Sequence, residues 1–118
     1  MDLTAKFQLK PGNQIEGVSV PQSVSAELTA LVTGPLHAKE LGVLVFVVDR
    51  SALDQHRSRI VAAASEDRLT WVAYPKAGQL GTDLNRDSLA ADLGENRIRP
   101  VRQIAIDDVW SALRFRPS

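Results

Sequence analysis

The sequence of 118 residues contains no cysteine. This absence excludes disulfide bonds and thiolate metal sites, and it fits a reducing compartment, so we expect a cytoplasmic protein. The longest apolar run covers residues 43–48 and is far shorter than the roughly 20 residues that cross a bilayer. The N-terminal segment MDLTAKFQLK lacks the apolar centre of a signal peptide. We therefore expect neither export nor a membrane partner.

An excess of charge of one sign is also missing, because 14 Lys and Arg residues balance 14 Asp and Glu residues. Arginines gather near the C-terminus, at Arg97, Arg99, Arg102, Arg114 and Arg116. In the sequence, Glu95, Asp107 and Asp108 are interleaved with them. Nucleic-acid binding needs several uncompensated cations. We therefore interpret the arginines as a solvated strand surface and do not expect a nucleic-acid partner.

The composition is that of an ordinary globular protein, with 44% hydrophobic and 24% charged residues. The length and the absence of a linker predict one domain over residues 1–118. Short apolar runs predict strands at 42–48 (GVLVFVV), 69–74 (LTWVAY) and 100–106 (PVRQIAI), with a weaker strand at 14–20. Residues 109–116 (VWSALRFR) alternate and predict an antiparallel return strand after a turn at Asp107 and Asp108.

Three helices are expected between these strands. Residues 23–32 have apolar side chains at helical spacing, and residues 52–64 follow Ser51, a favourable N-cap with Asp54 three positions later. Thr82 or Asp83 is expected to cap a third helix that runs to Leu93 and ends at Gly94. The alternation predicts an α/β fold, with a three-layer, mostly parallel Rossmann-like sheet and a C-terminal antiparallel hairpin strand.

The segments LKPG, GVLVFVVD, LTWVAYPK, TDLN and DDVWSALRF occur in this order along the chain. In these segments the sequence resembles the bacterial domain of unknown function (DUF) 3052 family, most closely from Leu69 to Phe115. The family looks like a shortened methyltransferase-like Rossmann domain, so the resemblance implies that fold and adds no chemistry. Residues 14–33 depart from the family pattern. A methyltransferase cofactor site needs a glycine-rich turn after the first strand, and SVPQS at 19–23 has no glycine. We therefore expect no cofactor.

The carboxyl ends of parallel strands meet at one rim of an open sheet, where ligands usually bind. The rim of the predicted sheet would gather the candidate ligand-binding residues Lys76, Asp83, Arg86, Asp107, Asp108 and Trp110. The loop from Pro75 to Asp83 would lead into a helix N-terminus, which favours anions. The aspartates would pair with Lys76 or Arg86, hold a hard cation through their carboxylate oxygens, or simply form a hairpin turn. Neither histidine has a second ligand at metal-binding spacing, and no serine lies in a nucleophile-elbow motif.

Two functions are compatible with these features, and a third, nucleic-acid binding through the arginines of the last two strands, would require those side chains to share a face unopposed by Asp107 and Asp108. The first is a non-enzymatic binding or protein-interaction domain on a degenerate Rossmann-like sheet, with an unknown protein or a second copy of the chain as partner. The alternative is a small-molecule or nucleotide-binding protein, including a methyltransferase-like enzyme, that uses the strand-end rim. The sequence identifies no catalytic residue and no metal ligand. A real cleft at the rim would favour the alternative function.

Overall fold

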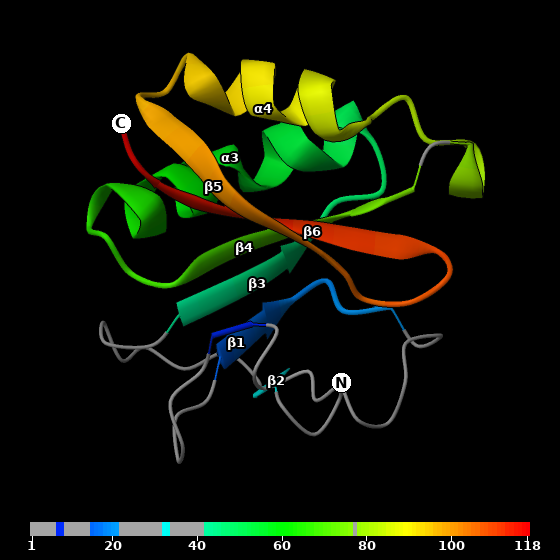
Figure 1. The fold of residues 1–118 in the computed structure, drawn as a ribbon, viewed down its shortest axis with the longest axis horizontal. Coiled ribbons are helices and arrows are strands. Elements are labelled where there is room, and N and C mark those ends of the chain that lie inside the picture. The colour runs from blue at the N-terminus through cyan, green and yellow to red at the C-terminus, as the bar shows by residue number, and fades with distance from the viewer. Residues whose placement is uncertain (1–6, 9–14, 22–31, 34–41, 77) are drawn as a thin grey trace.

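A computed structural model describes residues 7–8, 15–21, 32–33, 42–76 and 78–118 (Figure 1). Within these residues, a sheet of six strands has the order β2-β1-β3-β4-β6-β5. The strands are β1 (Ile15–Val18), β2 (Val32–Thr33), β3 (Gly42–Phe46), β4 (Thr70–Pro75), β5 (Ile98–Ala105) and β6 (Trp110–Pro117). The helical elements are α3 (Arg50–Ser65), the 3₁₀ turn η1 (Gln79–Gly81) and α4 (Arg86–Gly94).

The strand directions correct the predicted fold class. Strands β2, β1, β3 and β4 pair in parallel, whereas β6 pairs antiparallel with both β4 and β5. The sheet is therefore mixed, and the prediction of a mostly parallel Rossmann-like sheet is wrong. The turn at Asp107 returns the chain between β4 and β5, so the antiparallel strand lies inside the sheet instead of closing its edge. Hydrophobic patterns predict that a strand exists, but they do not specify its neighbours.

The layering also differs from the prediction, because both described α-helices cover the same face of the sheet (Figure 1). Leu53 and Ile60 of α3 and Leu89 and Leu93 of α4 share one core cluster with the valines of β3. We call this side of the sheet the helix face. On the opposite face, Phe7, Phe46, Trp71 and Trp110 belong to a second cluster. The helix predicted at 23–32 lies outside the described residues, except for Val32, which is in β2.

Helix α3 starts two residues earlier than its predicted range. Its N-cap is Asp49, whose Oδ1 accepts a hydrogen bond from the Ala52 amide at 2.9 Å, and not Ser51 as predicted. Asp54 does not complete a capping box. Its Oδ1 accepts a hydrogen bond from Arg57 Nη2 at 2.7 Å. An aspartate directly after a strand was available as a cap, and it is among the preferred N-cap residues.

Helix α4 starts later than predicted, and its N-cap is Asn85 instead of Thr82 or Asp83. The Asn85 side chain accepts from the Ser88 amide at 2.9 Å, and Ser88 Oγ accepts from the Asn85 amide at 3.0 Å. This reciprocal pair satisfies two donors that would otherwise be unpaired at the helix start. The helix ends within one residue of the predicted end, but Gly94 is its last helical residue and Glu95 its C-cap, so the predicted role of Gly94 as the glycine beyond the helix end is wrong. The pair fixes where α4 begins, next to the carboxyl end of β4.

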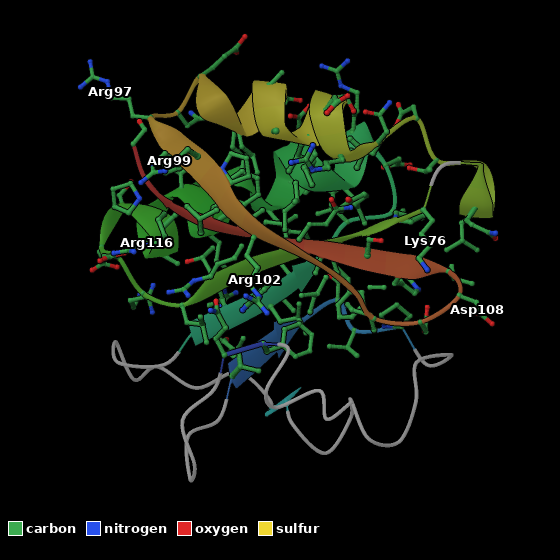
Figure 2. The ribbon with its side chains drawn as sticks, viewed as in Figure 1. Lys76, Arg97, Arg99, Arg102, Asp108 and Arg116 are labelled. Carbon is green, nitrogen blue, oxygen red and sulfur yellow. The ribbon has the colours of Figure 1, made fainter. Side chains whose placement is uncertain are left out.

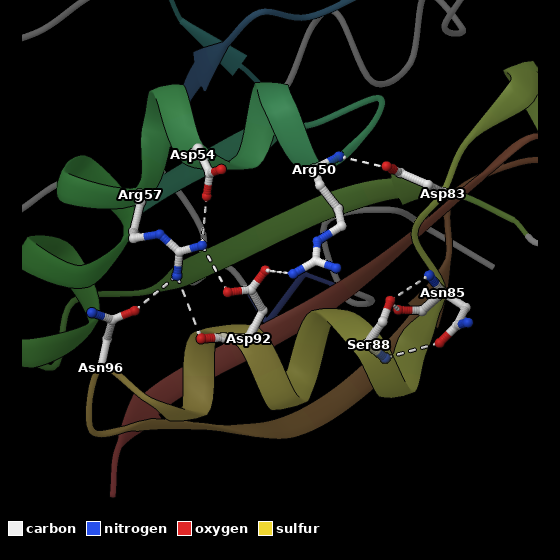
Figure 3. A network of polar contacts seen from close by, with 8 residues as sticks. All are labelled: Arg50, Asp54, Arg57, Asp83, Asn85, Ser88, Asp92 and Asn96. Carbon is white, nitrogen blue, oxygen red and sulfur yellow. Dashed lines mark hydrogen bonds and ion pairs between the residues drawn. The ribbon is translucent and has the colours of Figure 1, made fainter.

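A polar network joins the two helices above the sheet (Figure 3). The guanidinium of Arg57 donates to Asp92 Oδ1 at 2.7 Å and to Asn96 Oδ1 at 2.9 Å. Arg50 pairs with the other oxygen of Asp92 at 3.3 Å. The hydrogen bonds that Arg57 donates to Asp54 and Asp92 raise the pKa of Arg57 above its ordinary value. The network holds α4 at a fixed position over the helix face.

Candidate functional site

A pocket of about 410 Å³ lies at the carboxyl end of β4, next to the start of α4. This volume falls within the range typical of small-molecule sites. Side chains from β4, α4, β5 and β6 and from the connecting segments line the pocket: Tyr74, Lys76, Asn85, Arg86, Asp87, Gln103 and Ser111. The lining is polar and carries both signs of charge, so the pocket is suited to a charged or hydrogen-bonding ligand.

Tyr74 is the most informative neutral group in the pocket. The residue is only 3% exposed, and its hydroxyl accepts a hydrogen bond from Gln103 Nε2 at 3.1 Å. Ser111 lies directly opposite Tyr74 on β6 and also hydrogen bonds with its side chain. Burial raises the pKa of Tyr74 above its ordinary value, although Arg86 offsets part of this effect. The phenol therefore stays neutral at physiological pH and offers a hydrogen bond, not a charge.

Two cations, Lys76 and Arg86, and one carboxylate, Asp87, line the same pocket. The Lys76 amide donates to the Val109 carbonyl at 2.7 Å, which fixes the end of β4 beside the start of β6. Arg86 is the first residue of α4 and pairs with Asp87 only at 3.7 Å, with both side chains well exposed. An exposed ion pair of this kind contributes little stability, so Arg86 can exchange it for a ligand. The helix N-terminus adds a partial positive charge, and the pocket as a whole favours an anion.

The structure brings together two of the six predicted ligand-binding residues, Lys76 and Arg86. Asp83 lies outside the pocket, where its Oδ1 accepts from the Arg50 amide at 2.9 Å (Figure 3). Asp107 caps its own turn, because its Oδ1 accepts from the amides of Val109 and Trp110 at 2.8 and 2.7 Å. Asp108 is exposed at the tip of the β5–β6 hairpin (Figure 2).

Trp110, the sixth predicted residue, is on the opposite face of the sheet. Its ring packs edge-to-face against Phe46, with centroids 5.0 Å apart, and the residue is 3% exposed. Five further residues line the pocket and are not among the six candidates: Tyr74, Asn85, Asp87, Gln103 and Ser111. Tyr74 and Ser111 are in apolar strand segments, which by themselves predict only buried strands. Their pairing across β4 and β6 depends on the insertion of β6, which the sequence does not reveal.

A second, largely apolar pocket of about 400 Å³ lies on another part of the surface, and Phe46, Leu80 and Trp110 are among its lining residues. Ser19 and His56 line it as well, with Ser19 Oγ 3.1 Å from His56 Nε2. A serine–histidine pair also needs a group that orients the histidine ring. In the described segments no carboxylate hydrogen bonds to His56, so we assign no catalysis to this pair.

The described residues contain no group of three or more histidine or acidic side chains arranged to hold a metal ion. No helix in the described part of the chain is long and apolar enough to cross a membrane. Comparisons of the chain with protein-family models, with curated proteins and with solved structures found no match. The resemblance to the DUF 3052 family therefore stays a prediction, and the functional argument depends on the geometry alone.

Proposed function

We propose that this protein is a binding domain for a small anionic molecule, held in the pocket at the carboxyl end of β4. The observation that carries the proposal is that Lys76, Arg86 and the buried Tyr74 line one pocket of about 410 Å³. The cations would bind a phosphate or carboxylate group. Tyr74, Gln103 and Ser111 would hydrogen bond to hydroxyl or carbonyl groups on the remainder of the ligand.

Charge and local structure both support an anion over a cation. Lys76 and Arg86 outnumber Asp87, and the first turn of α4 adds the positive end of the helix dipole. The predicted interaction-domain function has support of a different kind, the apolar pocket beside Leu80, which is 57% exposed. Nothing in that pocket identifies a partner, so protein interaction and homodimer formation stay predictions.

Thermal-shift measurements on the purified protein test this function. The panel contains inorganic phosphate, nucleotides, S-adenosylmethionine, phosphorylated metabolites and dicarboxylates. A ligand at a hundredfold its dissociation constant stabilises the native state by about 2.7 kcal/mol, which raises Tm by several degrees at this size. Lys76→Ala and Arg86→Gln each remove a charge-assisted hydrogen bond, so we expect the affinity to fall about tenfold or more.

Tyr74→Phe tests the neutral part of the same pocket, because it removes only the hydroxyl. The matched control is Arg99→Gln, which removes one exposed arginine from the opposite face of the sheet and should leave the ligand shift unchanged. A ligand that stabilises Lys76→Ala and Arg86→Gln as strongly as the original protein would contradict the proposed pocket. A flat response from a well-folded sample to every anion in the panel would contradict the function itself.

A further inference from the structure

Four arginines lie side by side on the hairpin formed by β5 and β6. Arg99 is directly opposite Arg116, and Arg102 is directly opposite Arg114. Residues opposite each other in an antiparallel pair project from the same face. Arg114 is in turn opposite Trp71 of β4, and Trp71 belongs to the core cluster on the side away from the helices. All four side chains therefore leave the sheet on the face opposite the helices.

An irregularity in β5 produces this arrangement. Arg99 and Arg102 are three positions apart, so a regular strand would send them to opposite faces. The register shifts between Pro100 and Arg102, and the extra residue restores the second arginine to the face of the first. We call the set of Arg99, Arg102, Arg114 and Arg116 the arginine face.

Among the residues that the structure describes, few groups neutralise the arginine face. Within the described part of the chain, Asp67 is the one carboxylate that pairs with these four arginines, and both of its oxygens accept from Arg116 at 3.0 Å. Arg114 donates to Gln8 Oε1 at 2.6 Å, and its buried Nε has no partner. Arg99 and Arg102 are exposed. Burial and the nearby positive charges of Arg116 and Arg102 lower the pKa of Arg114.

Two of the acidic residues that are interleaved with these arginines in the sequence, Asp107 and Asp108, are separated from them in space. Asp107 and Asp108 occupy the turn at the far tip of the hairpin, while Arg99, Arg102 and Arg116 follow the rest of its length (Figure 2). Arg97, just before β5, extends the positive charge beyond the other end (Figure 2). Zero net charge for the whole chain therefore hides a local excess of cations on one surface.

We propose that the arginine face binds the phosphate backbone of a nucleic-acid duplex without reading its sequence. Guanidinium groups form bidentate hydrogen bonds with phosphate, and two adjacent strands present them as a contiguous cationic surface. The surface is at the edge of the sheet, because β5 is its last strand. This site is on the other face from the pocket and does not depend on the ligand proposed there.

The character of the face favours a duplex over the two nearest alternatives. Single-strand binding relies on exposed aromatic rings for stacking. Phe7 and Trp71 belong to the second core cluster, and both are 0% exposed. A protein partner would need a desolvated apolar centre. Val101 is the only large hydrophobic residue of the described β5 and β6 strands that is exposed. Interfaces with nucleic acid are instead polar and strongly positive.

Fluorescence anisotropy with a short labelled DNA duplex of mixed sequence tests the proposal. If the four arginines release four counterions, the logarithm of the binding constant falls against the logarithm of salt concentration with a slope of about −3.6. The same relation predicts an affinity loss of roughly 100-fold between about 50 and 200 mM salt. Arg99→Gln and Arg102→Gln should each weaken binding and reduce the magnitude of the slope by about 0.9.

Asp67→Asn supplies a variant with the opposite expected effect. It removes the carboxylate that competes with phosphate for Arg116, so affinity for the duplex should rise about two- to fivefold, the equivalent of a surface ion pair. Asparagine also tolerates the left-handed backbone of this residue, where φ is 57°. Arg86→Gln in the pocket is the matched control, and it should leave duplex binding unchanged while it weakens the anion ligand.

Four results would overturn the proposal. The first is that the double variant Arg99→Gln and Arg102→Gln, with its fold checked by circular dichroism, binds the duplex as tightly as the original protein does. The second is the absence of measurable duplex binding at low salt. The third is binding of polyglutamate at least as tight as binding of the duplex, which would assign the arginine face to an acidic protein partner. A loss of duplex binding in Arg86→Gln alone would move the nucleic acid to the pocket and overturn the assignment to this face.

Discussion

Arg57 Nη2 donates to Asp92 Oδ1 at 2.7 Å, and this contact joins two helices that are 35 residues apart at these positions. Asp92 is largely shielded, with a side chain only 13% exposed, and it also pairs with Arg50. The contact is distant from the pocket lining, but it holds α4, whose first residues contribute Arg86 and Asp87 to the pocket. The network is therefore a structural support for the proposed binding site.

Replacing Asp92 with asparagine should destabilise the protein by about 1–3 kcal/mol, because it removes the charge from hydrogen bonds that satisfy two arginines. Chemical denaturation measures the change in the free energy of unfolding. The control is Asp87→Asn, which affects an exposed carboxylate on the same helix and should cost far less. Equal losses in the two variants would show that the network does not stabilise the packing of α4 on α3.

The acid titration of Asp67 should report its pairing with Arg116. Hydrogen bonds from Arg116 lower the pKa of Asp67 below its ordinary value of about 3.8. A lowered pKa in the folded state means that the pair stabilises the protein above the unfolded pKa. The contribution is lost as the pH falls through the folded pKa. Carboxyl NMR should show this low value, and Arg116→Gln should return it toward the ordinary one. An unchanged pKa in Arg116→Gln would contradict the pairing.

Two glycines should respond in opposite directions to alanine. A Cβ at Gly42 would lie 2.6 Å from the Leu69 carbonyl oxygen and 2.8 Å from Leu69 Cβ, so β3 and the start of β4 would have to separate. We expect Gly42→Ala to cost about 1–3 kcal/mol, as overpacking usually does. At Gly94 nothing lies within 4 Å of the added atom, so Gly94→Ala should stabilise α4 by about 0.4–1 kcal/mol. Thermal unfolding of both variants measures the difference.

The sequence predicted individual elements better than their arrangement. The runs at 42–48 and 69–74 were identified correctly because buried strands need continuous β-branched and aromatic residues. The antiparallel return of β6 was also predicted from its alternation. The position of β6 between β4 and β5 was not, since hydrogen-bonding partners are set by tertiary packing. Tyr74, Gln103 and Ser111 meet only because of that insertion, so the pocket could be predicted only in part, through Lys76 and Arg86.

For the arginine face, the sequence could state only the condition, that the arginines of the last two strands share a face unopposed by Asp107 and Asp108, and could not show that it is met. Charges alternating along the chain are expected to neutralise one another, but a hairpin moves the two aspartates of its turn to one end. The irregularity at Val101 then brings Arg102 to the same face as Arg99, although the two residues are three positions apart in the sequence. Neither the hairpin register nor a bulge has a distinct signature in this segment. The local charge therefore became apparent only with the register of β5 against β6.

Phe7 gives the last prediction, because it attaches a short N-terminal segment to the core. Its ring packs edge-to-face on Trp71 with centroids 5.3 Å apart, and its carbonyl accepts from Trp71 Nε1 at 3.1 Å. Both residues are 0% exposed. Phe7→Ala removes a fully buried ring and should destabilise the protein by about 3–5 kcal/mol. It should also expose Trp71 to water, which shifts tryptophan emission to longer wavelength.

Phe7→Leu separates volume from ring geometry in the same position. Leucine restores most of the apolar contact but not the edge-to-face interaction, which is worth about 0.5–1.5 kcal/mol beyond burial. We therefore expect Phe7→Leu to recover most of the stability that Phe7→Ala loses, with Trp71 emission close to that of the original protein. If Phe7→Ala left both stability and emission unchanged, Phe7 would not cover Trp71. The core on this side of the sheet would then not include Phe7.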